Sequence, residues 1–203
     1  MMPSKIVCIG RNYVEHAKEL GNEVPSEPLI FLKPPSSLLA QDETILLPTQ
    51  SQQVEYEGEI GVVIGKTLSH VSETEAVKGI RSIVALNDVT ARDLQRKDSQ
   101  WSRAKGFDTF CPVGPEFTGA YDLDDITVIT RVNGEEKQRG NSHDMAFKIP
   151  FLLAYVSRIM TLEPGDILAT GTPHGVGKLA PGDVVEVEVV GMSKVSNPVA
   201  QGR

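Results

Sequence analysis

Three glutamates stand at alternate positions in the run VEYEGEIGVVIG, residues 54–65. On a β-strand, residues two apart point to the same face, so Glu55, Glu57 and Glu59 share one side of the expected strand. Burying like charges together costs free energy unless something compensates them, so this face either is solvated or carries a positive charge. The apolar, glycine-flanked continuation IGVVIG favours burial.

A hard divalent cation would offset these charges. Mg²⁺ and Ca²⁺ prefer carboxylate oxygens, and two carboxylates two apart on a strand can reach one ion from the same side. The best candidate for a third ligand is Asp88 in VALNDVTARD, where an apolar strand ends in polar residues, a common place for a site. The alternative is a solvated face of an antiparallel sheet, and the spacing alone leaves both interpretations open.

Two further groups could take part in catalysis. His16 and Glu19 in GRNYVEHAKEL stand three apart, which makes them neighbours on one face of a helix. A carboxylate beside a histidine fixes its tautomer and raises its basicity, as in a general base, although a surface helix can carry the same pair by chance. Lys105 in SRAKGFDTFCPVGP could neutralise a substrate carboxylate or an oxyanion, or be an ordinary loop lysine.

The elements that must position these residues are mostly strands. The strand-like runs are KIVCIG, LIFLK, GEIGVVIG, RSIVALNDVT, ITVITRVNG, DILATG and DVVEVEVVG, and Asn133-Gly134 predicts a hairpin turn. Helical periodicity is confined to Tyr13 to Leu20, Glu73 to Val77 with an extension towards Ile80, Ala91 to Asp98, and Ile149 to Ser157. The 13 prolines and 18 glycines are typical of a β-rich domain with many turns. We therefore predict one β-rich α+β domain over residues 1–203.

The composition is ordinary for a soluble globular protein, with 40% apolar and 23% charged residues. The net charge of −7 argues against a nucleic-acid partner. No apolar run approaches the roughly 18 residues of a membrane-spanning helix, and the start MMPSKIVCIGRNYVEH does not resemble a signal peptide. We expect Cys8 and Cys111 to be reduced thiols in the core of a cytoplasmic protein that has no membrane contact.

Taken together and in this order, the segments resemble the fumarylacetoacetate hydrolase family. The resemblance covers nearly the whole chain, through CIGRNYVEHAKELG, PLIFLKPPSSL, VEYEGEIGVVIG, LNDVTARDLQ, AKGFDTFCPVGP, LATGTPHGVG and the closing GDVVEVEVVGMSKVSNPV. The size suits the short subgroup that resembles acylpyruvases and oxaloacetate decarboxylases. The resemblance implies a mixed β-roll with a few short helices, a homodimer and a bound Mg²⁺ or Mn²⁺ ion.

By this resemblance, the metal ligands are Glu57, Glu59 and Asp88. Glu55 occupies a place where many family members have aspartate or histidine, so we expect it to remain outside the ligand set. Either Mg²⁺ or Mn²⁺ is expected, because sites made of carboxylates accept both ions.

The same resemblance assigns the other site residues. His16 and Glu19 match a dyad that activates water, and Lys105 matches a lysine near the metal. The implied substrate-binding residues are Arg11, Tyr13, Arg92, Gln95 and Thr172, of which Thr172 contacts a substrate carboxylate.

The expected substrate is a small 2-oxo acid, on which the metal acts as a Lewis acid. His16, oriented by Glu19, removes a proton from a water that attacks the acyl carbonyl, and Lys105 stabilises the developing negative charge. These roles predict hydrolysis of acylpyruvate-type 2,4-dioxo acids to pyruvate and a carboxylate, and with oxaloacetate the same site could support decarboxylation. The alternatives are an isomerase or decarboxylase of an aromatic-degradation pathway acting on a 2-oxo dicarboxylate, and a non-catalytic metal-binding β-domain.

Overall fold

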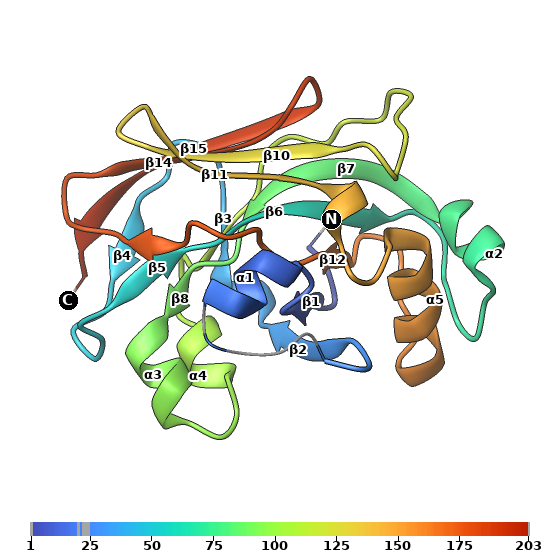
Figure 1. The fold of residues 1–203 in the computed structure, drawn as a ribbon, viewed down its shortest axis with the longest axis horizontal. Helices are drawn as coiled ribbons and strands as arrows, with labels where there is room; N and C mark the ends of the chain where they lie inside the picture. The colour runs from blue at the N-terminus through green and yellow to red at the C-terminus, as the bar shows by residue number, and fades with distance from the viewer. Residues whose placement is uncertain (1, 20, 22–24, 203) are drawn as a thin grey trace.

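The computed structural model of the chain describes residues 2–19, 21 and 25–202; of residues 16–18 it describes the backbone alone. Within those residues, two five-stranded sheets make up most of the molecule, and smaller sheets and short helices surround them (Figure 1). Both large sheets contain parallel and antiparallel pairs. The predicted β-rich α+β fold, a mixed β-roll with a few short helices, is confirmed.

The first sheet has the strand order β2-β1-β12-β6-β7. β1 pairs in parallel with β12, whereas the other neighbours are antiparallel. Because β1, β12 and β6 are adjacent, segments that are far apart in the sequence meet in this sheet. Its strands are β1 (Ile6–Gly10), β2 (Leu29–Lys33), β6 (Gly58–Ile64), β7 (Ile80–Asn87) and β12 (Ile167–Ala169).

The second sheet has the order β11-β10-β14-β15-β4, with β15 and β4 in parallel. Its strands are β4 (Ile45–Leu47), β10 (Thr127–Val132), β11 (Glu135–Asn141), β14 (Val184–Val189) and β15 (Ser193–Gln201). β10 and β11 form the hairpin that Asn133-Gly134 predicts, and both turn residues have positive φ, 52° and 80°, as a type I′ turn requires. β15 is absent from the predicted strands, because two of its buried positions are the polar residues Ser193 and Asn197.

The smaller elements include the four helices expected from periodicity. The helices are α1 (Val14–Glu19), α2 (Glu73–Val77), α3 (Arg92–Lys97), α4 (Ser102–Lys105) and α5 (Ile149–Ile159), with 3₁₀ turns at Pro35–Ser37 (η1) and Ser142–Asp144 (η2). The smaller sheets join β13 (Gly177–Lys178), β5 (Val54–Tyr56) and β8 (Thr90–Ala91), and β3 (Leu38–Leu39) with β9 (Cys111–Pro112). α4 is too short to show a period in the sequence. In the part of the chain that the structure describes, no helix combines the length and hydropathy needed to span a bilayer.

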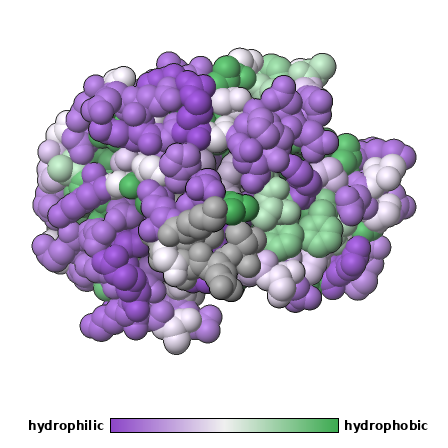
Figure 2. Space-filling model, viewed as in Figure 1, coloured by the Kyte–Doolittle hydropathy of each residue, from purple (hydrophilic) through white to green (hydrophobic). Residues whose placement is uncertain are grey.

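The main core lies between the two large sheets. Ile60 and Val62 of β6 and Ile83 of β7 belong to one buried cluster with Val187 of β14 and Val195 of β15. α5 and α2 pack against each other at one end of the sheets, and α3 and α4 lie near the opposite end (Figure 1). The face seen in Figure 2 is largely hydrophilic. The apolar strand residues are therefore buried between the layers rather than displayed on this face.

The run VEYEGEIGVVIG is one strand in the sequence prediction but two strands in the structure. β5 pairs with β13 and β8, whereas β6 joins the first sheet, and Glu57 lies at the break. Tyr56 consequently packs in a different apolar cluster from Ile60, although residues four apart would share one face of a single strand. Gly58 follows the break, and a Cβ there would lie 1.9 Å from Thr130 Oγ1. The close approach of β10 therefore requires glycine at this position.

Both cysteines are free and buried, as the sequence predicts. They belong to one apolar cluster beneath the first sheet. Burial raises the pKa of the Cys8 thiol and raises that of Cys111 to about 12. Because the thiolate is the reactive form, burial keeps both side chains unreactive.

Asp166, the residue that precedes β12, binds the segment before β1 through its side chain. Its carboxylate accepts hydrogen bonds from the Ser4 amide and hydroxyl at 2.8 and 2.7 Å, from Lys5 Nζ at 2.5 Å and from the Glu163 amide at 2.8 Å. Burial opposes the charged form, but the hydrogen bonds prevail and hold the pKa of Asp166 below its ordinary value. A carboxyl whose pKa is lowered by folding stabilises the fold at neutral pH, and this stabilisation is lost as the pH falls through that pKa.

We expect Asp166→Asn to lower the free energy of unfolding by about 1–3 kcal/mol at neutral pH, because the amide cannot replace all of these acceptor contacts. Urea unfolding at about pH 6 and about pH 3 should show the difference between wild type and variant shrinking at the lower pH. The control is Asp124→Asn, at an exposed position, which should have little effect. An undiminished difference at the lower pH would contradict the proposed linkage.

Candidate active site

Three carboxylates meet where β6 begins and β7 ends. Glu57, Glu59 and Asp88 each offer an oxygen, and these atoms lie within 4.8 Å of one another. Their exposed fractions are only 5%, 1% and 0%. The antiparallel register pairs Gly58 with Asn87, so the residues that flank this pair come together at one end of the sheet. The sequence predicts these three residues as a group, and the structure brings them together.

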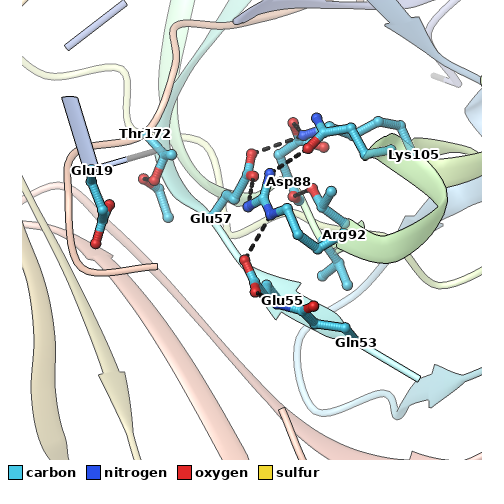
Figure 3. A network of polar contacts seen from close by, with 12 residues as sticks. Glu19, Gln53, Glu55, Glu57, Asp88, Arg92, Lys105 and Thr172 are labelled. Carbon is cyan, nitrogen blue, oxygen red and sulfur yellow. Dashed lines mark hydrogen bonds and ion pairs between the residues drawn. The ribbon is translucent and has the colours of Figure 1, made fainter. Parts of the chain in front are cut away.

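Two buried lysines lie against the carboxylates. Lys105 Nζ donates to Glu57 at 2.8 Å and to Asp88 at 2.5 Å (Figure 3). Lys33 Nζ donates to the other Asp88 oxygen at 2.7 Å. Burial alone would lower the pKa of Lys105, but Asp88 and Glu57 outweigh it and raise the pKa above the ordinary value. Lys105 therefore remains charged and offsets part of the buried negative charge. Lys33 adds a second buried ion pair with Asp88.

Glu55 pairs with the Arg92 guanidinium and does not join the cluster of Glu57, Glu59 and Asp88. Arg92 Nε donates to Glu55 at 2.7 Å, and Arg92 Nη2 donates to Glu57. Gln53 Nε2 also donates to Glu55, at 2.5 Å. Figure 3 shows Arg92 between the two glutamates, with Glu55 directed away from Asp88. This arrangement agrees with the expectation that Glu55 remains outside the metal ligands.

Glu59 is compensated less than its neighbours. Its Oε2 accepts the Gly171 amide at 2.7 Å. In contrast, the ion pairs that Lys33, Lys105 and Arg92 make with the three clustered carboxylates involve Glu57 and Asp88. Burial raises the pKa of Glu59, and the charges of Asp88 and Glu57 raise it further. A cation between the three carboxylates would remove this repulsion.

The donor set fits a hard divalent cation. All three side chains offer carboxylate oxygens, which Mg²⁺ and Mn²⁺ accept. Four buried carboxylates, those of Glu55 and the three clustered residues, face three buried cations, Lys33, Lys105 and Arg92. One negative charge is therefore left over when all seven groups are ionised, and a divalent ion would reverse its sign.

A cavity of about 370 Å³ opens beside the carboxylates. Most of the predicted site residues line it, and its wall is rich in basic side chains. Arg11 has a left-handed backbone conformation, with φ of 57°, which a non-glycine residue adopts at some cost. The lining residues are Ile9, Gly10, Arg11, Phe31, Glu57, Glu59, Arg92, Gln95, Arg96, Trp101, Lys105 and Thr172.

Tyr13 is a predicted substrate-binding residue that does not line the cavity. It is 3% exposed and belongs to the main apolar core. Its hydroxyl is buried and has no hydrogen-bond partner among the described residues. Burial, with the nearby charge of Glu59, raises the pKa of this hydroxyl. We therefore propose no direct substrate contact for Tyr13.

Of the predicted dyad, the structure describes the side chain of Glu19 but not that of His16. His16 lies in α1, but its side chain is outside the described part of the structure. Glu19, at the end of α1, accepts the Gly175 amide at 3.0 and 3.2 Å. Figure 3 shows Glu19 beside Thr172, on the far side of the site from Lys105. Whether His16 and Glu19 act together stays a prediction.

Several residues of the site have no role in the sequence prediction. Lys33 ends β2 at the motif LIFLKPP, where a lysine that closes an apolar strand is a local signal for a buried charge. Phe31, in the same strand, packs edge-on against Trp101, with ring centroids 5.3 Å apart. Arg96 lines the cavity one turn after Arg92 and donates to Gln53 at 2.5 Å.

The comparison with known proteins identifies a family model that fits the chain. The model for the fumarylacetoacetate (FAA) hydrolase C-terminal region matches residues 5–200. The human mitochondrial oxaloacetate tautomerase FAHD2A is 42% identical over 209 residues, which cover 97% of this chain and 67% of that protein. The mitochondrial oxaloacetate decarboxylase of Dictyostelium discoideum is 43% identical over 195 residues, which cover 93% of this chain and 89% of that protein.

A solved structure is similar over the full chain. The 5-carboxymethyl-2-hydroxymuconate delta-isomerase from Mycobacterium smegmatis superposes with a TM-score of 0.93 at 41% identity. The match covers 100% of this chain and 81% of the isomerase chain. At this identity and coverage, the similarity extends beyond the fold to the family.

We expect Glu59→Gln to abolish stabilisation by Mg²⁺ or Mn²⁺, because it removes one ligand charge and keeps the side-chain shape. Wild type should gain about 2–3 kcal/mol in unfolding free energy when the ion is near 100 times its Kd. Thermal unfolding with the ion and with EDTA measures this difference. Glu55→Gln is the matched control, since Glu55 is a buried glutamate of the same run, and it should keep the metal-induced shift. Loss of the shift in the control alone would contradict the ligand assignment.

We expect Lys33→Met to lower the free energy of unfolding in EDTA by about 3–5 kcal/mol, because Asp88 loses a buried cation. Added Mg²⁺ should recover part of this loss, so its stabilising effect should be larger than in wild type. Chemical unfolding with and without the ion measures both quantities. Lys194→Met removes a half-exposed surface pair with Glu186 and should leave the metal effect unchanged. A smaller metal effect in Lys33→Met would count against charge compensation.

Proposed function

Since this chain belongs to the fumarylacetoacetate hydrolase family, we propose that it is a divalent-metal-dependent enzyme acting on a small 2-oxo acid, with oxaloacetate as the first candidate substrate. The observation that carries the proposal is the buried carboxylate triad beside a cavity of about 370 Å³ with basic side chains in its wall. A 2-oxo acid is small and anionic, which suits both the volume and the charge of this cavity.

Glu57, Glu59 and Asp88 would hold the ion, which is Mg²⁺ or Mn²⁺ in this proposal because every donor is a carboxylate oxygen. When bound, the ion supplies Lewis-acid stabilisation of negative charge on a carbonyl oxygen. The buried lysines hold two of the three ligands close together, because Lys105 lies between Glu57 and Asp88 and Lys33 lies against Asp88.

The remaining side chains would bind and orient the substrate. Lys105 lines the cavity and contacts two of the carboxylates, so its ammonium can stabilise negative charge that develops on a substrate beside them. Arg92 and Gln95 of α3 are joined by a hydrogen bond of 2.5 Å and line the same cavity. Their N–H groups can orient a substrate carboxylate. Arg11 supplies another guanidinium from the loop after β1.

Oxaloacetate is favoured by the relatives, which are named as an oxaloacetate tautomerase and an oxaloacetate decarboxylase. Removal of a proton from C3 and loss of the C4 carboxylate as CO₂ both leave an electron pair that forms the enolate of a 2-oxo acid. Both reactions therefore need stabilisation of one developing negative charge, and neither needs an activated water. The cationic wall around the carboxylates supports this common requirement.

One observation favours a second reaction, hydrolysis of acylpyruvate-type 2,4-dioxo acids to pyruvate and a carboxylate. Glu19 reaches the loop that carries Thr172, through the Gly175 amide. His16 stands one helical turn earlier in α1. Hydrolysis would use His16 to remove a proton from water, with Glu19 as the group that orients it.

The proposal retains three expectations that do not depend on the reaction. They are a single catalytic domain over residues 1–203, a homodimer and a cytoplasmic location. The proposed binding partner is the small-molecule substrate alone, without nucleic acid or membrane.

The first test measures turnover of oxaloacetate and of acetylpyruvate by the purified protein, with Mg²⁺ and with EDTA. Loss of enol absorbance reports tautomerisation, and pyruvate release reports decarboxylation or hydrolysis; metal without enzyme is the blank, because free ions decarboxylate oxaloacetate. We expect metal-dependent turnover, and a decrease in kcat of about 10²-fold or more in Lys105→Met. Lys148→Met, away from the cavity, should retain activity. Turnover that EDTA leaves unchanged would contradict the metal proposal.

His16→Ala separates the two candidate reactions. If His16 activates water, the variant should lose acetylpyruvate hydrolysis by about 10²–10⁴-fold and keep part of its activity on oxaloacetate. The ratio of the two kcat values, measured on one preparation, removes differences in folded fraction. Equal loss of both activities would count against a separate water-activating role.

A further inference from the structure

A glutamine from the second sheet reaches the residue between two proposed metal ligands. Gln138 of β11 is 2% exposed, and its Oε1 accepts the Gly58 amide at 3.0 Å. Its Nε2 donates to Thr172 Oγ1 at 2.9 Å and to the Pro173 carbonyl at 2.8 Å. Thr172 Oγ1 in turn donates to the Gly58 carbonyl at 2.9 Å. Gly58, Gln138 and Thr172 thus form a closed ring of hydrogen bonds.

The backbone determines how the Gln138 amide is oriented. The Gly58 N–H can only donate and the Pro173 carbonyl can only accept. An amide turned by 180° would place a donor against the first group and an acceptor against the second. Both contacts would then be lost in a buried site, where unpaired polar groups are costly. Nε2 must therefore face Thr172.

The orientation of Gln138 decides what the Thr172 hydroxyl can do. A hydroxyl has one proton and two lone pairs. One lone pair accepts Gln138 Nε2, and the proton is donated to the Gly58 carbonyl. Thr172 is 3% exposed and lines the cavity, so what it has left for a ligand is a lone pair. Within this ring, the hydroxyl of Thr172 can offer a ligand in the cavity a hydrogen-bond acceptor.

We propose that Gln138 is a positioning residue of this site, which through Thr172 presents a hydrogen-bond acceptor to the substrate. The inference rests on the proposed function, because it takes the ligand to be a 2-oxo acid or a close analogue. An acceptor at this point favours a ligand oxygen that carries a proton, such as the enol hydroxyl of a 2-oxo acid or the hydroxyl of a 2-hydroxy acid. It disfavours a carboxylate oxygen, in contrast to the contact that the family resemblance implies for Thr172.

The ring connects the second sheet to the part of the first sheet that carries the proposed metal ligands. Gly58 lies between Glu57 and Glu59, and it is held at its amide by Gln138 and at its carbonyl by Thr172. The adjacent Gly171 amide binds Glu59, and Glu19 binds the Gly175 amide two residues after Pro173. The loop after β12 is therefore tied to the carboxylates on one side and to α1 on the other.

The test compares two small ligands by calorimetry on the Mg²⁺-loaded protein. Glycolate carries a hydroxyl next to its carboxylate, whereas oxalate carries only acceptor oxygens at neutral pH. We expect Thr172→Val to weaken glycolate binding by about tenfold, the effect of one lost hydrogen bond, and to leave oxalate equal or tighter. Thr172→Ser, which restores the hydroxyl, should restore glycolate binding. Equal effects on both ligands, or a larger loss for oxalate, would overturn the proposal.

The positioning role of Gln138 is tested by a double-mutant cycle. Gln138→Met should lower the glycolate-to-oxalate preference in wild type, because the Thr172 hydroxyl is then free to turn, and should have no further effect on it in Thr172→Val. A full effect of Gln138→Met in both backgrounds would show that Gln138 does not act through Thr172.

Two measurements separate this inference from simpler explanations. Asn197→Leu removes another buried amide that donates to two carbonyls, those of Ala40 and Glu43, and should lower stability without changing the ligand preference. A change in the glycolate-to-oxalate preference in Asn197→Leu would show that loss of any buried amide has this effect, and would contradict a specific role for Gln138. Wild type that binds neither ligand would refute the proposed function itself, and this inference with it; wild type that binds both, with no change in Thr172→Val, would refute the inference alone.

Discussion

Burial of like charge is the constraint on which this structure depends. Three carboxylates lie together in the interior, where an isolated ionised carboxylate is costly. Lys33 and Lys105 offset part of that charge, and both would be equally costly in the interior without the carboxylates. Neither set of charges is stable alone. β2, β6, β7 and α4 carry or flank these residues and must therefore pack at one place. The fold thus depends on the same ion pairs that build the site.

A series of ion pairs and hydrogen bonds extends from the buried carboxylates through α3 to the surface. Arg92 joins Glu57 to Glu55, Gln53 joins Glu55 to Arg96, and Arg96 lies in the wall of the cavity. Charged groups are thus connected from the deepest carboxylate to the surface. A change in charge inside the cavity therefore changes the electrostatic energy of each charged group in this series, because ion pairs in an environment of low dielectric constant are weakly screened. Such a wall suits chemistry in which an anion binds and negative charge then moves between its oxygens.

The two large sheets contribute different functions to the site. The first sheet supplies the carboxylates, and its backbone at Gly58 sets the direction of the glutamates on either side. The second sheet supplies Gln138, which holds Gly58 and the hydroxyl of Thr172. α1 adds Glu19 from a third direction. In the proposed function, reactions that need only a stabilised enolate would use the first two contributions. Hydrolysis would also use the helix, because His16, the proposed base, lies there.

Sequence by itself determined the local features: the hairpin at Asn133-Gly134, the helices with a clear period, and two carboxylates two apart in one run with a third just after a strand end. These depend on neighbours along the chain, which periodicity and turn chemistry describe. Only the tertiary structure decided that the run breaks at Glu57, that Glu55 pairs with Arg92, that Lys33 reaches Asp88, and that the Tyr13 hydroxyl is buried outside the cavity. The physical reason is that an ion pair or a buried contact forms between residues far apart in sequence, and packing alone brings them together.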